Sequence, residues 1–509
     1  MFAAAKMMFV RLGSRLPVIW SGGSTVDAFW SRQENWTELS IPQNGDTLTF
    51  AGLIRSSPVN DISDLALKGI TFAAGGASFN LSGLPFTLHS GAFINTEAAG
   101  KIHTIANPIT LEGTLAINCT EVDSLGRSLT LSGGITGGAS GSLVKNGSGL
   151  LFLNSANDYA GGTTVNAGTL KILNKNSLWM GLLTLNANAT LDLNGSNLEN
   201  GSGTSAHIAS AVGSRIINSG NPFLTGSSAR GTYFSPSLGT TGLMTFNAQI
   251  DDSAGNLISV RFGHSNGSIT LTHANHKIRG TVVLTSAITT VSNLAYGSFG
   301  AGDLLVGNSN ATPELKYVGT ADSNFNDPTV GAAKRDILLN NGTSMGTGGG
   351  MILENNGTGK LTMGGVYATD NSSAKLLTLG GSNTLDNTMT GDIRNAATMG
   401  VVSVKKTGTG KWRLTGVNTY TGLTTIDGGT LVSVVLCATR TTTLATGNFT
   451  KLAGLTVTFA GAAVQVNDTF RFFPGAFSQG YTGTALKLPT GYAGSFSQSL
   501  STLTITAVP

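Results

Sequence analysis

Paired carboxylates are the residues in this sequence that could support acid–base chemistry. A glycan-cleaving site needs two or three carboxylates on one face of the fold. The best-placed pair is Asp251-Asp252, which is followed by Gly263-His264. The other close acidic residues are Asp61 with Asp64, Glu121 with Asp123, and Asp386 with Asp392. Acidic residues are otherwise sparse, and the sequence shows no longer row of them.

The order of Asp251-Asp252 and Gly263-His264 resembles part of the site of polygalacturonases, which are β-helical enzymes. The upstream Asn-Thr-Asp and the downstream Arg-Ile-Lys of that site are absent. The segment also lies directly before a repeated motif. We therefore favour a structural role for it over a catalytic one.

Metal and cofactor sites are not indicated either. A metal site needs several Cys, His, Asp or Glu side chains converging in space. Only two histidines are close in sequence, with no such partner beside them, and we expect the histidines on a solvated face. The six are His89, His103, His207, His264, His273 and His276. The Asp-containing Gly-Gly nonapeptide of calcium-binding β-rolls does not occur, and Gly147-Ser148-Gly149-Leu150 is interpreted as a turn, not a phosphate-binding loop. No catalytic, cofactor or metal residue is predicted.

Composition favours a folded, nearly uncharged chain. Of 509 residues, 11% are charged, against about 25% in ordinary globular proteins, and 70 are Gly. The hydrophobic share of 40% is enough to build a core. The net charge of +4 comes from scattered Lys and Arg, so no nucleic-acid partner is expected. Cys119 and Cys437 lie far apart in sequence, and we do not expect a disulfide between them.

The elements are strands. Apolar triplets such as Leu-Thr-Leu alternate with Gly, Asn and Ser turns, and helical periodicity is nearly absent. No run of 18 apolar residues occurs, so no transmembrane segment is expected. Residues 1–19 form an atypical N-terminal segment that lacks the apolar stretch of a secretory signal.

One motif recurs at fixed offsets. The segment Lys145–Ile172 (KNGSGLLFLNSANDYAGGTTVNAGTLKI) returns 261 residues later, where Asn157 meets Asn418 and Tyr159 meets Tyr420. A weaker copy lies 118 residues on, with Lys277 at the Tyr position. Repeat units are therefore predicted near 143–172, 261–290 and 404–434. Short strands joined by Gly/Asn turns are what the coils of a β-helix require.

These motifs resemble the autotransporter-associated β-strand repeat, also called the passenger-associated transport repeat, of the type KTGxGxLxLxGxNTYTGxTTVxxGTL. The match is closest at 406–431. The resemblance implies an all-β, right-handed parallel β-helix over 53–434. It also implies a passenger-like region; the residues after the last repeat are not expected to form a translocator barrel.

The two ends differ from the repeats. Residues 20–52 contain Trp20, Trp30 and Trp36, which would close the open end of a solenoid as an N-terminal cap. Residues 435–509 are predicted as a non-repetitive C-terminal β cap. Residues 432–450 fit neither pattern.

The resemblance implies a non-catalytic extracellular protein of the cell surface, either an adhesin-like passenger or a structural component of a fibre or envelope. A surface rich in Thr, Ser and Asn suits contacts with carbohydrate or other cell-surface components, and open strand edges suit self-association into fibres. The alternative is a β-helical polysaccharide lyase or glycoside hydrolase, which would need a row of carboxylates on one face.

Overall fold

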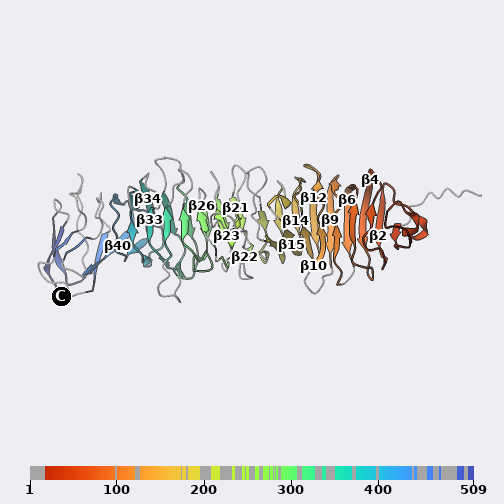
Figure 1. Cartoon of the computed structure of the whole chain (residues 1–509). Coiled ribbons are helices and arrows are strands. Elements are labelled where there is room, and N and C mark those ends of the chain that lie inside the picture. Colours follow the sequence, from red (N-terminus) through yellow and green to blue (C-terminus); the bar gives the residue numbers. More distant parts are fainter. Residues whose placement is uncertain are drawn as a thin grey trace, which may run out of the picture. The chain divides into compact units, whose positions relative to one another are not determined.

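The chain divides into two compact units, Met1–Gly181 and Leu182–Pro509. The computed structural model describes residues 18–508 except 98–99, 121–126, 174, 179–180, 195–207, 218–231, 235–242, 247, 252–257, 263–267, 274–275, 279, 281, 285–287, 307–311, 327–334, 340–349, 369–373, 397–399, 438–440, 444–454, 462–468, 472–489 and 498–501. Within these ranges each unit is a stack of short strands (Figure 1). The only helical turns described are three 3-10 turns: η1 (Gln33–Asn35), η2 (Thr37–Leu39) and η3 (Lys175–Ser177).

The first unit has two long parallel sheets and a short third side. Sheet A is formed by β1 (Val18–Trp20), β2 (Asp46–Phe50), β4 (Leu65–Phe72), β6 (Phe86–Thr96), β9 (Thr114–Cys119), β12 (Ser142–Asn146) and β14 (Thr163–Val165). Sheet C continues from β3 (Val59–Asn60) through β5 (Asn80–Gly83), β7 (His103–Ile105), β10 (Arg127–Leu131), β13 (Leu150–Leu153) and β15 (Gly168–Ile172). The third side pairs β8 (Ile109–Leu111) with β11 (Ile135–Thr136).

Register sets which residues form the core. In sheet A the main chain of Ile94 pairs with Ile117, Ile117 with Lys145, and Lys145 with Val165. Successive coils therefore advance by 23, 28 and 20 residues at this position. Side chains alternate across each strand, so this column points inward, and all four members are buried. Each coil thus contributes one layer of core.

The first coil of this unit is rich in aromatic side chains. Trp20 and Trp36 meet edge to face with ring centroids 5.0 Å apart, and Trp30 packs edge to face on Trp36 at 6.2 Å. Phe50 of the next coil lies 6.0 Å from Trp36. The three tryptophans are almost fully buried, so they form the aromatic core of this coil.

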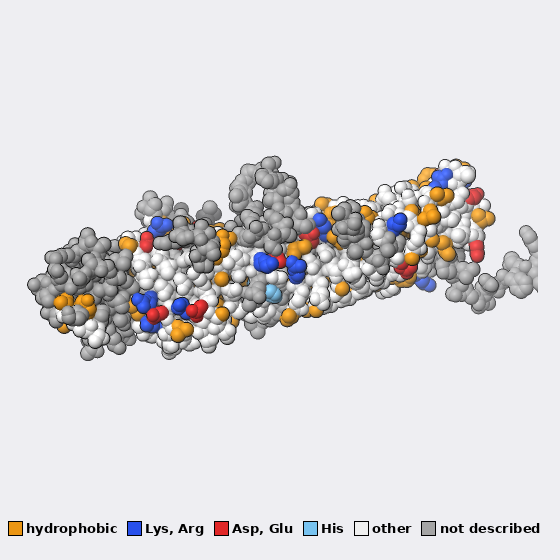
Figure 2. All heavy atoms as spheres, turned by 90° about the horizontal axis from the view of Figure 1, so that it is seen from below, with side chains coloured by type: hydrophobic (Ala, Val, Ile, Leu, Met, Phe, Trp, Pro, Cys, Tyr) orange, Lys and Arg blue, Asp and Glu red, His pale blue; other side chains and the backbone are white. Residues whose placement is uncertain are grey.

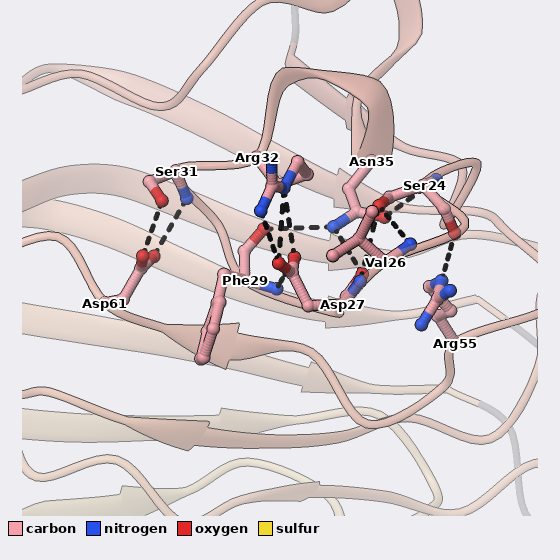
Figure 3. A network of polar contacts seen from close by, with 9 residues as sticks. All are labelled: Ser24, Val26, Asp27, Phe29, Ser31, Arg32, Asn35, Arg55 and Asp61. Carbon is pink, nitrogen blue, oxygen red and sulfur yellow. Dashed lines mark hydrogen bonds and ion pairs between the residues drawn. The ribbon is translucent and has the colours of Figure 1, made fainter.

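Polar contacts hold together the chain segment between Ser24 and Asn35 (Figure 3). Arg32 forms an ion pair with Asp27 at 2.6 Å, and this contact holds the pKa of the Asp27 carboxyl below its usual value. The buried Asn35 side chain donates to the main-chain oxygens of Asp27 and Phe29, each at 3.1 Å. The loop that carries Trp30 and Trp36 is therefore tied together by its own side chains.

The second unit has three parallel sheets, one on each side of the coil. Sheet D contains β20 (Thr232–Phe234), β23 (Ile258–Phe262), β25 (Val282–Leu284), β27 (Leu304–Val306), β30 (Ile337–Leu339), β33 (Val366–Ala368) and β36 (Ile393–Arg394). Sheet E contains β21 (Leu243–Phe246), β24 (Ser268–Leu271), β26 (Ile288–Val291), β28 (Glu314–Tyr317), β31 (Gly350–Asn355), β34 (Lys375–Gly381), β37 (Val402–Lys406) and β39 (Thr424–Ile426). Sheet F contains β29 (Ser323–Asn324), β32 (Leu361–Met363), β35 (Asn387–Met389), β38 (Lys411–Leu414), β40 (Thr430–Cys437) and β42 (Leu455–Gly461).

Both ends of this unit depart from the three-sided pattern. At its beginning β16 (Leu183–Leu185) pairs with β18 (Ile208–Ser210), and β17 (Ala189–Asp192), β19 (Arg215–Ile217) and β22 (Gln249–Asp251) form a second ladder. At its end β41 (Thr441–Thr443), β43 (Thr469–Arg471), β44 (Ala493–Ser497) and β45 (Thr502–Ala507) form a separate sheet. There β45 is antiparallel to β43 and β44. Strand β40 extends to Cys437, so part of the unassigned stretch 432–450 continues sheet F.

The prediction of an all-β parallel solenoid is confirmed. Every other strand pairing described in either unit is parallel, and consecutive strands in a sheet come from consecutive coils. Gly at the coil corners makes the stacking possible. Gly147 has φ +77°, and a Cβ there would lie 2.3 Å from the main-chain oxygen of Cys119 in the coil above.

Candidate functional surface

The predicted candidate carboxylate is held in an ion-pair network. Asp251 ends β22 and is 3% exposed. Its Oδ2 accepts a hydrogen bond from Arg215 at 2.8 Å and lies 3.6 Å from Lys277 Nζ. Asp252, Gly263 and His264 lie outside the described residues. The carboxylate that the sequence singled out is therefore paired with two cations in the described residues.

The described members of the other predicted acidic pairs each have their own hydrogen-bond or ion-pair partners. Asp386 is bound by Lys411 at 2.5 Å and by Arg413 at 3.1 Å. Asp392 accepts the main-chain N–H of Val417 at 2.7 Å. Asp61 accepts hydrogen bonds from Ser31, whereas Glu121 and Asp123 lie outside the described residues. In the part of the chain that the structure describes, no three His, Cys, Asp or Glu side chains are grouped as metal ligands.

The prediction that the histidines lie on a solvated face is wrong for His103 and His276. His103 is fully buried, and its Nδ1 accepts the main-chain N–H of Phe79 at 3.3 Å. His276 is 4% exposed, and its Nδ1 accepts the N–H of Ile250 at 3.1 Å. Burial lowers the pKa of His103 to about 4 and that of His276 to about 3. Both rings serve as core acceptors that link neighbouring coils.

The lysine of the first repeat has a role that sequence reasoning missed. The Nζ of Lys145 donates to the main-chain oxygens of Asn146 at 3.0 Å, Gly147 at 2.7 Å and Ala167 at 3.0 Å. The side chain is 0% exposed. Two of these oxygens belong to the turn that follows β12 and the third to the turn that precedes β15, so one ammonium group ties two successive coils together.

The second repeat contains the same arrangement. The Nζ of Lys406 donates to the main-chain oxygens of Thr407, of Gly408 at 3.4 Å and of Gly428 at 3.2 Å. Burial lowers the pKa of both Lys145 and Lys406 to about 8, while three oxygen acceptors favour the ammonium form. We call this arrangement the lysine clamp. The alternation of side chains along each strand indicates this inward position, because β12 and β37 place Lys145 and Lys406 on the same face as Leu143 and Val404.

The repeat tyrosines are buried as well. The Tyr159 hydroxyl lies 2.8 Å from Thr163 Oγ1, and the Tyr420 hydroxyl lies 2.7 Å from Thr424 Oγ1. Burial raises the pKa of Tyr420 to about 12 and that of Tyr159 still further above its usual value. In both repeats the tyrosine is therefore bonded to the threonine that begins the following strand, β14 or β39, and helps to close the corner before it.

The repeat asparagines bridge coils in the same way. The side-chain oxygen of Asn157 accepts the N–H of Ile135 at 2.9 Å, and that of Asn418 accepts the N–H of Ile393 at 2.9 Å. Lys, Asn and Tyr, the most distinctive side chains of the repeat, are thus directed inward. What the repeats present to solvent is the outer face of their strands.

On sheet A this outer face carries a ladder of asparagine side chains. The Nδ2 of Asn118 donates to Asn95 Oδ1 at 2.7 Å, and that of Asn146 donates to Asn118 Oδ1 at 2.8 Å. Asn166 continues the ladder by donating to Asn146 Oδ1 at 2.6 Å. The neighbouring outward column is Phe93, Ala116, Val144 and Thr164. Both columns are uncharged.

Uncharged side chains dominate the visible surface of the described residues, and the charged groups on it are small and mixed in sign (Figure 2). Several are ion pairs, such as Lys405 with Asp427 at 2.8 Å and Lys316 with Glu314 at 2.6 Å. None of the helical turns in the described ranges has the length and apolarity to cross a membrane.

Comparison with known proteins agrees with this architecture. The passenger-associated transport repeat model matches residues 143–172 and 404–432, the first and third of the predicted units. The chain is 30% identical over 315 residues to the "Adhesin BmaC autotransporter" of Brucella suis biovar 1 (strain 1330). The alignment covers 59% of this chain and 8% of that protein, so the chain spans less than a tenth of its relative's length. No solved structure matches the chain.

Proposed function

We propose that this chain, which carries two passenger-associated transport repeats and is distantly similar to an adhesin autotransporter, is a non-catalytic, adhesin-like passenger displayed outside the cell. Its role is to present a stable, nearly uncharged β-solenoid surface to carbohydrates or other cell-surface components. Extracellular location and the adhesin role both belong to this proposal.

The observation that carries the proposal is the direction of the repeat side chains. Lys145 and Lys406 are fully buried, and Tyr159 and Tyr420 are about 1% exposed. A repeat built around a catalytic site would turn its distinctive polar groups toward a cleft. Here those groups hold coils together, and the outer ladder of Asn side chains and its uncharged neighbouring column are left for contacts.

Location and activity are tested separately. Antibodies against the purified chain should label intact cells of the organism that makes it, and external protease should remove the label. Purified chain should bind cells or glycans without releasing reducing ends or unsaturated products. Labelling seen only after permeabilisation would contradict the location, and product release would favour the polysaccharide-degrading alternative.

The same proposal includes a second role for the chain, as a structural component that self-associates into fibres. Strand edges at the ends of a parallel stack have unpaired main-chain groups, which suit end-to-end pairing. Electron microscopy of purified chain distinguishes the two roles, because filaments support a fibre component and isolated particles support an adhesin.

A further inference from the structure

Sheet D of the second unit presents two outward columns side by side. In the first, Leu305 pairs in register with Leu338, Leu338 with Tyr367, and Tyr367 with Arg394. These side chains lie between the inward residues of their strands, so they point out of the sheet. Leu305, Leu338 and Tyr367 are each partly exposed. The column is an apolar strip with a guanidinium group at its end.

The second column contains three carboxylates. Asp303, Asp336, Gly365 and Asp392 each directly precede the first inward residue of β27, β30, β33 and β36, so they share one outward row. Asp303 Oδ1 accepts the N–H of Asp336 at 2.8 Å, and Asp336 Oδ1 accepts the N–H of Gly365 at 2.8 Å. These bonds fix both carboxylates, and no described residue donates a hydrogen bond to either Oδ2. We call the two columns together the sheet D face.

No described residue forms an ion pair with Asp303, Asp336 or Asp392. This distinguishes them from Asp251 and Asp386, which are bound by cations. The nearby Arg335 is 3% exposed and donates instead to the main-chain oxygens of Phe299, Phe325 and Gly302. The acidic row therefore has unused capacity to accept hydrogen bonds and to attract positive charge.

Gly365 interrupts this row of carboxylates beside the tyrosine. A Cβ at Gly365 would lie 2.6 Å from the main-chain oxygen of Asp392 and 2.8 Å from Asp336 Oδ1, so a side chain does not fit. The Arg394 guanidinium lies 4.4 Å from the centre of the Tyr367 ring. Burial, and then the charges of Asp303 and Asp336, raise the pKa of the Tyr367 hydroxyl, which places all three groups in one electrostatic environment.

We propose that the sheet D face binds an extended glycan whose sugars carry free amino groups. The apolar faces of the sugar rings pack against Leu338 and Tyr367, while their hydroxyl and ammonium groups donate to Asp303 and Asp336. Charge complementarity decides the class: among the described side chains of this face, three carboxylates without an ion pair outnumber the guanidinium of Arg394. This balance favours a cationic ligand and repels uronic acids. Asp392, on the far side of Gly365, extends the acidic row for the next sugar.

A peptide fits this face less well. The strands of sheet D are already paired along the row, so their main chains offer no edge to an added strand. An amphipathic helix needs an apolar groove, whereas the apolar column here is a single row of side chains. A glycan needs neither an edge nor a groove.

The test is binding of labelled glucosamine oligomers to the purified full chain at pH 6, where amines are protonated and carboxylates ionised. We expect N-acetylated oligomers of the same length to bind at least tenfold more weakly and galacturonic acid oligomers not to bind. The double variant D303N/D336N should lose at least tenfold in affinity, and Tyr367→Ala should also weaken binding. Added NaCl should lower the affinity, because surface charges are screened.

The matched control is Asp322→Asn. Asp322 is an exposed carboxylate of the same unit that pairs with Lys360 beside β29, away from sheet D. It should leave binding unchanged, and circular dichroism should show that all variants remain folded. Equal binding of acetylated and free-amine oligomers, unchanged affinity in D303N/D336N, or binding of a basic amphipathic peptide in place of the oligomers would overturn the proposal.

This inference names a partner for the proposed adhesin role and rests on it for its biological setting. The binding measurement uses purified chain, whereas the location test uses intact cells. Failed binding would remove the sheet D ligand and leave surface display standing. Failed surface labelling would remove the display role and leave the measured binding.

Discussion

At the scale of single residues, the lysine clamp is the least expected feature of the molecule. A buried ammonium group is costly unless its hydrogens are all bonded. Lys145 and Lys406 meet that condition with main-chain oxygens alone, three for each Nζ. The clamp works only if the two coils stack in one register, since the third oxygen is supplied by the following coil. It therefore specifies register as well as stability.

The neighbouring lysines of β37 allow a matched test of the clamp. Lys406→Met keeps the length of the side chain but removes a charged donor that binds three main-chain oxygens, so we expect a loss of about 1–3 kcal/mol in the free energy of unfolding. Lys405→Met removes only a surface pair with Asp427, which contributes about 0–1 kcal/mol. Urea unfolding followed by circular dichroism measures both. Equal losses would show that the clamp adds nothing.

For the repeat lysines, two signals in the sequence point in opposite directions. The repeat motif identified Lys145 and Lys406, yet lysine is rarely buried, so the residue type pointed to solvent. Strand alternation pointed inward, because Leu143 and Val404 lie two residues earlier on the same face. Alternation was the stronger signal here, since the turns of the repeat supply enough oxygens to hold an ammonium group.

At the scale of elements, the asparagine ladder shows how the outer face of sheet A is ordered. Asn118 and Asn146 each use one N–H and one oxygen along the stack, so both amides are held in a single orientation. At the ends of the ladder, Asn95 accepts and Asn166 donates. Amide chains of this kind polarise one another, and their members are expected to act together. The ladder links β6, β9 and β12 through side chains as well as main chain.

A double-mutant cycle measures this coupling. Asn118→Ala and Asn146→Ala remove partners that lie 2.8 Å apart, so the loss in the double variant should differ from the sum of the single losses by about 0.5–1.5 kcal/mol. Asn95 and Asn146 do not bond each other directly and serve as the control pair, with weaker coupling. Additive losses for Asn118 and Asn146 would mean that the amides act independently.

The strands and the repeat could be predicted from sequence, but the alignment of distant coils could not. Asp303, Asp336 and Asp392 share one row although they are separated by 33 and 56 residues. Their alignment depends on the length of each coil, which varies with the loops between strands. Sequence proximity instead singled out Asp251-Asp252, and Asp251 is neutralised by Arg215 and Lys277.

At the scale of the whole molecule, the described residues of each unit include a core histidine that must stay neutral. A main-chain N–H donates to Nδ1 of His103 in the first unit and of His276 in the second, so protonating either Nδ1 would break that bond. The Nε2 atoms of both rings are buried without a partner among the described residues. Protonation at low pH should therefore destabilise the core of both units.

Stability should fall as the pH drops below about 6.5. The folded-state pKa of His103 is lowered to about 4, so below 6.5 the unfolded chain binds the extra proton and gains free energy relative to the folded chain. The loss grows until about pH 4 and reaches at most roughly 3 kcal/mol for this group. Urea unfolding at a series of pH values between 7.5 and 4.5 measures this loss of stability.

His103→Asn keeps an acceptor for Phe79 but removes the titrating ring, so its stability should depend less on pH over this range. His89→Asn is the control, because His89 is exposed and bonds Glu112 at 2.7 Å on the surface. It should retain the pH dependence of the natural chain. The same slope in all three proteins would exclude His103 as the source.

The coil lengths have a consequence for where this chain can change. From Lys145 to Val165 and from Lys406 to Ile426 the chain completes a coil in 20 residues, whereas from Tyr317 to Asn355 it takes 38. The repeat coils have no residues to spare, since their turns also supply the oxygens of the lysine clamp. Insertions and deletions should therefore be tolerated in the long coils and rejected in the short ones. The repeat coils should therefore keep a constant length, while the longer coils between them can vary in length and surface.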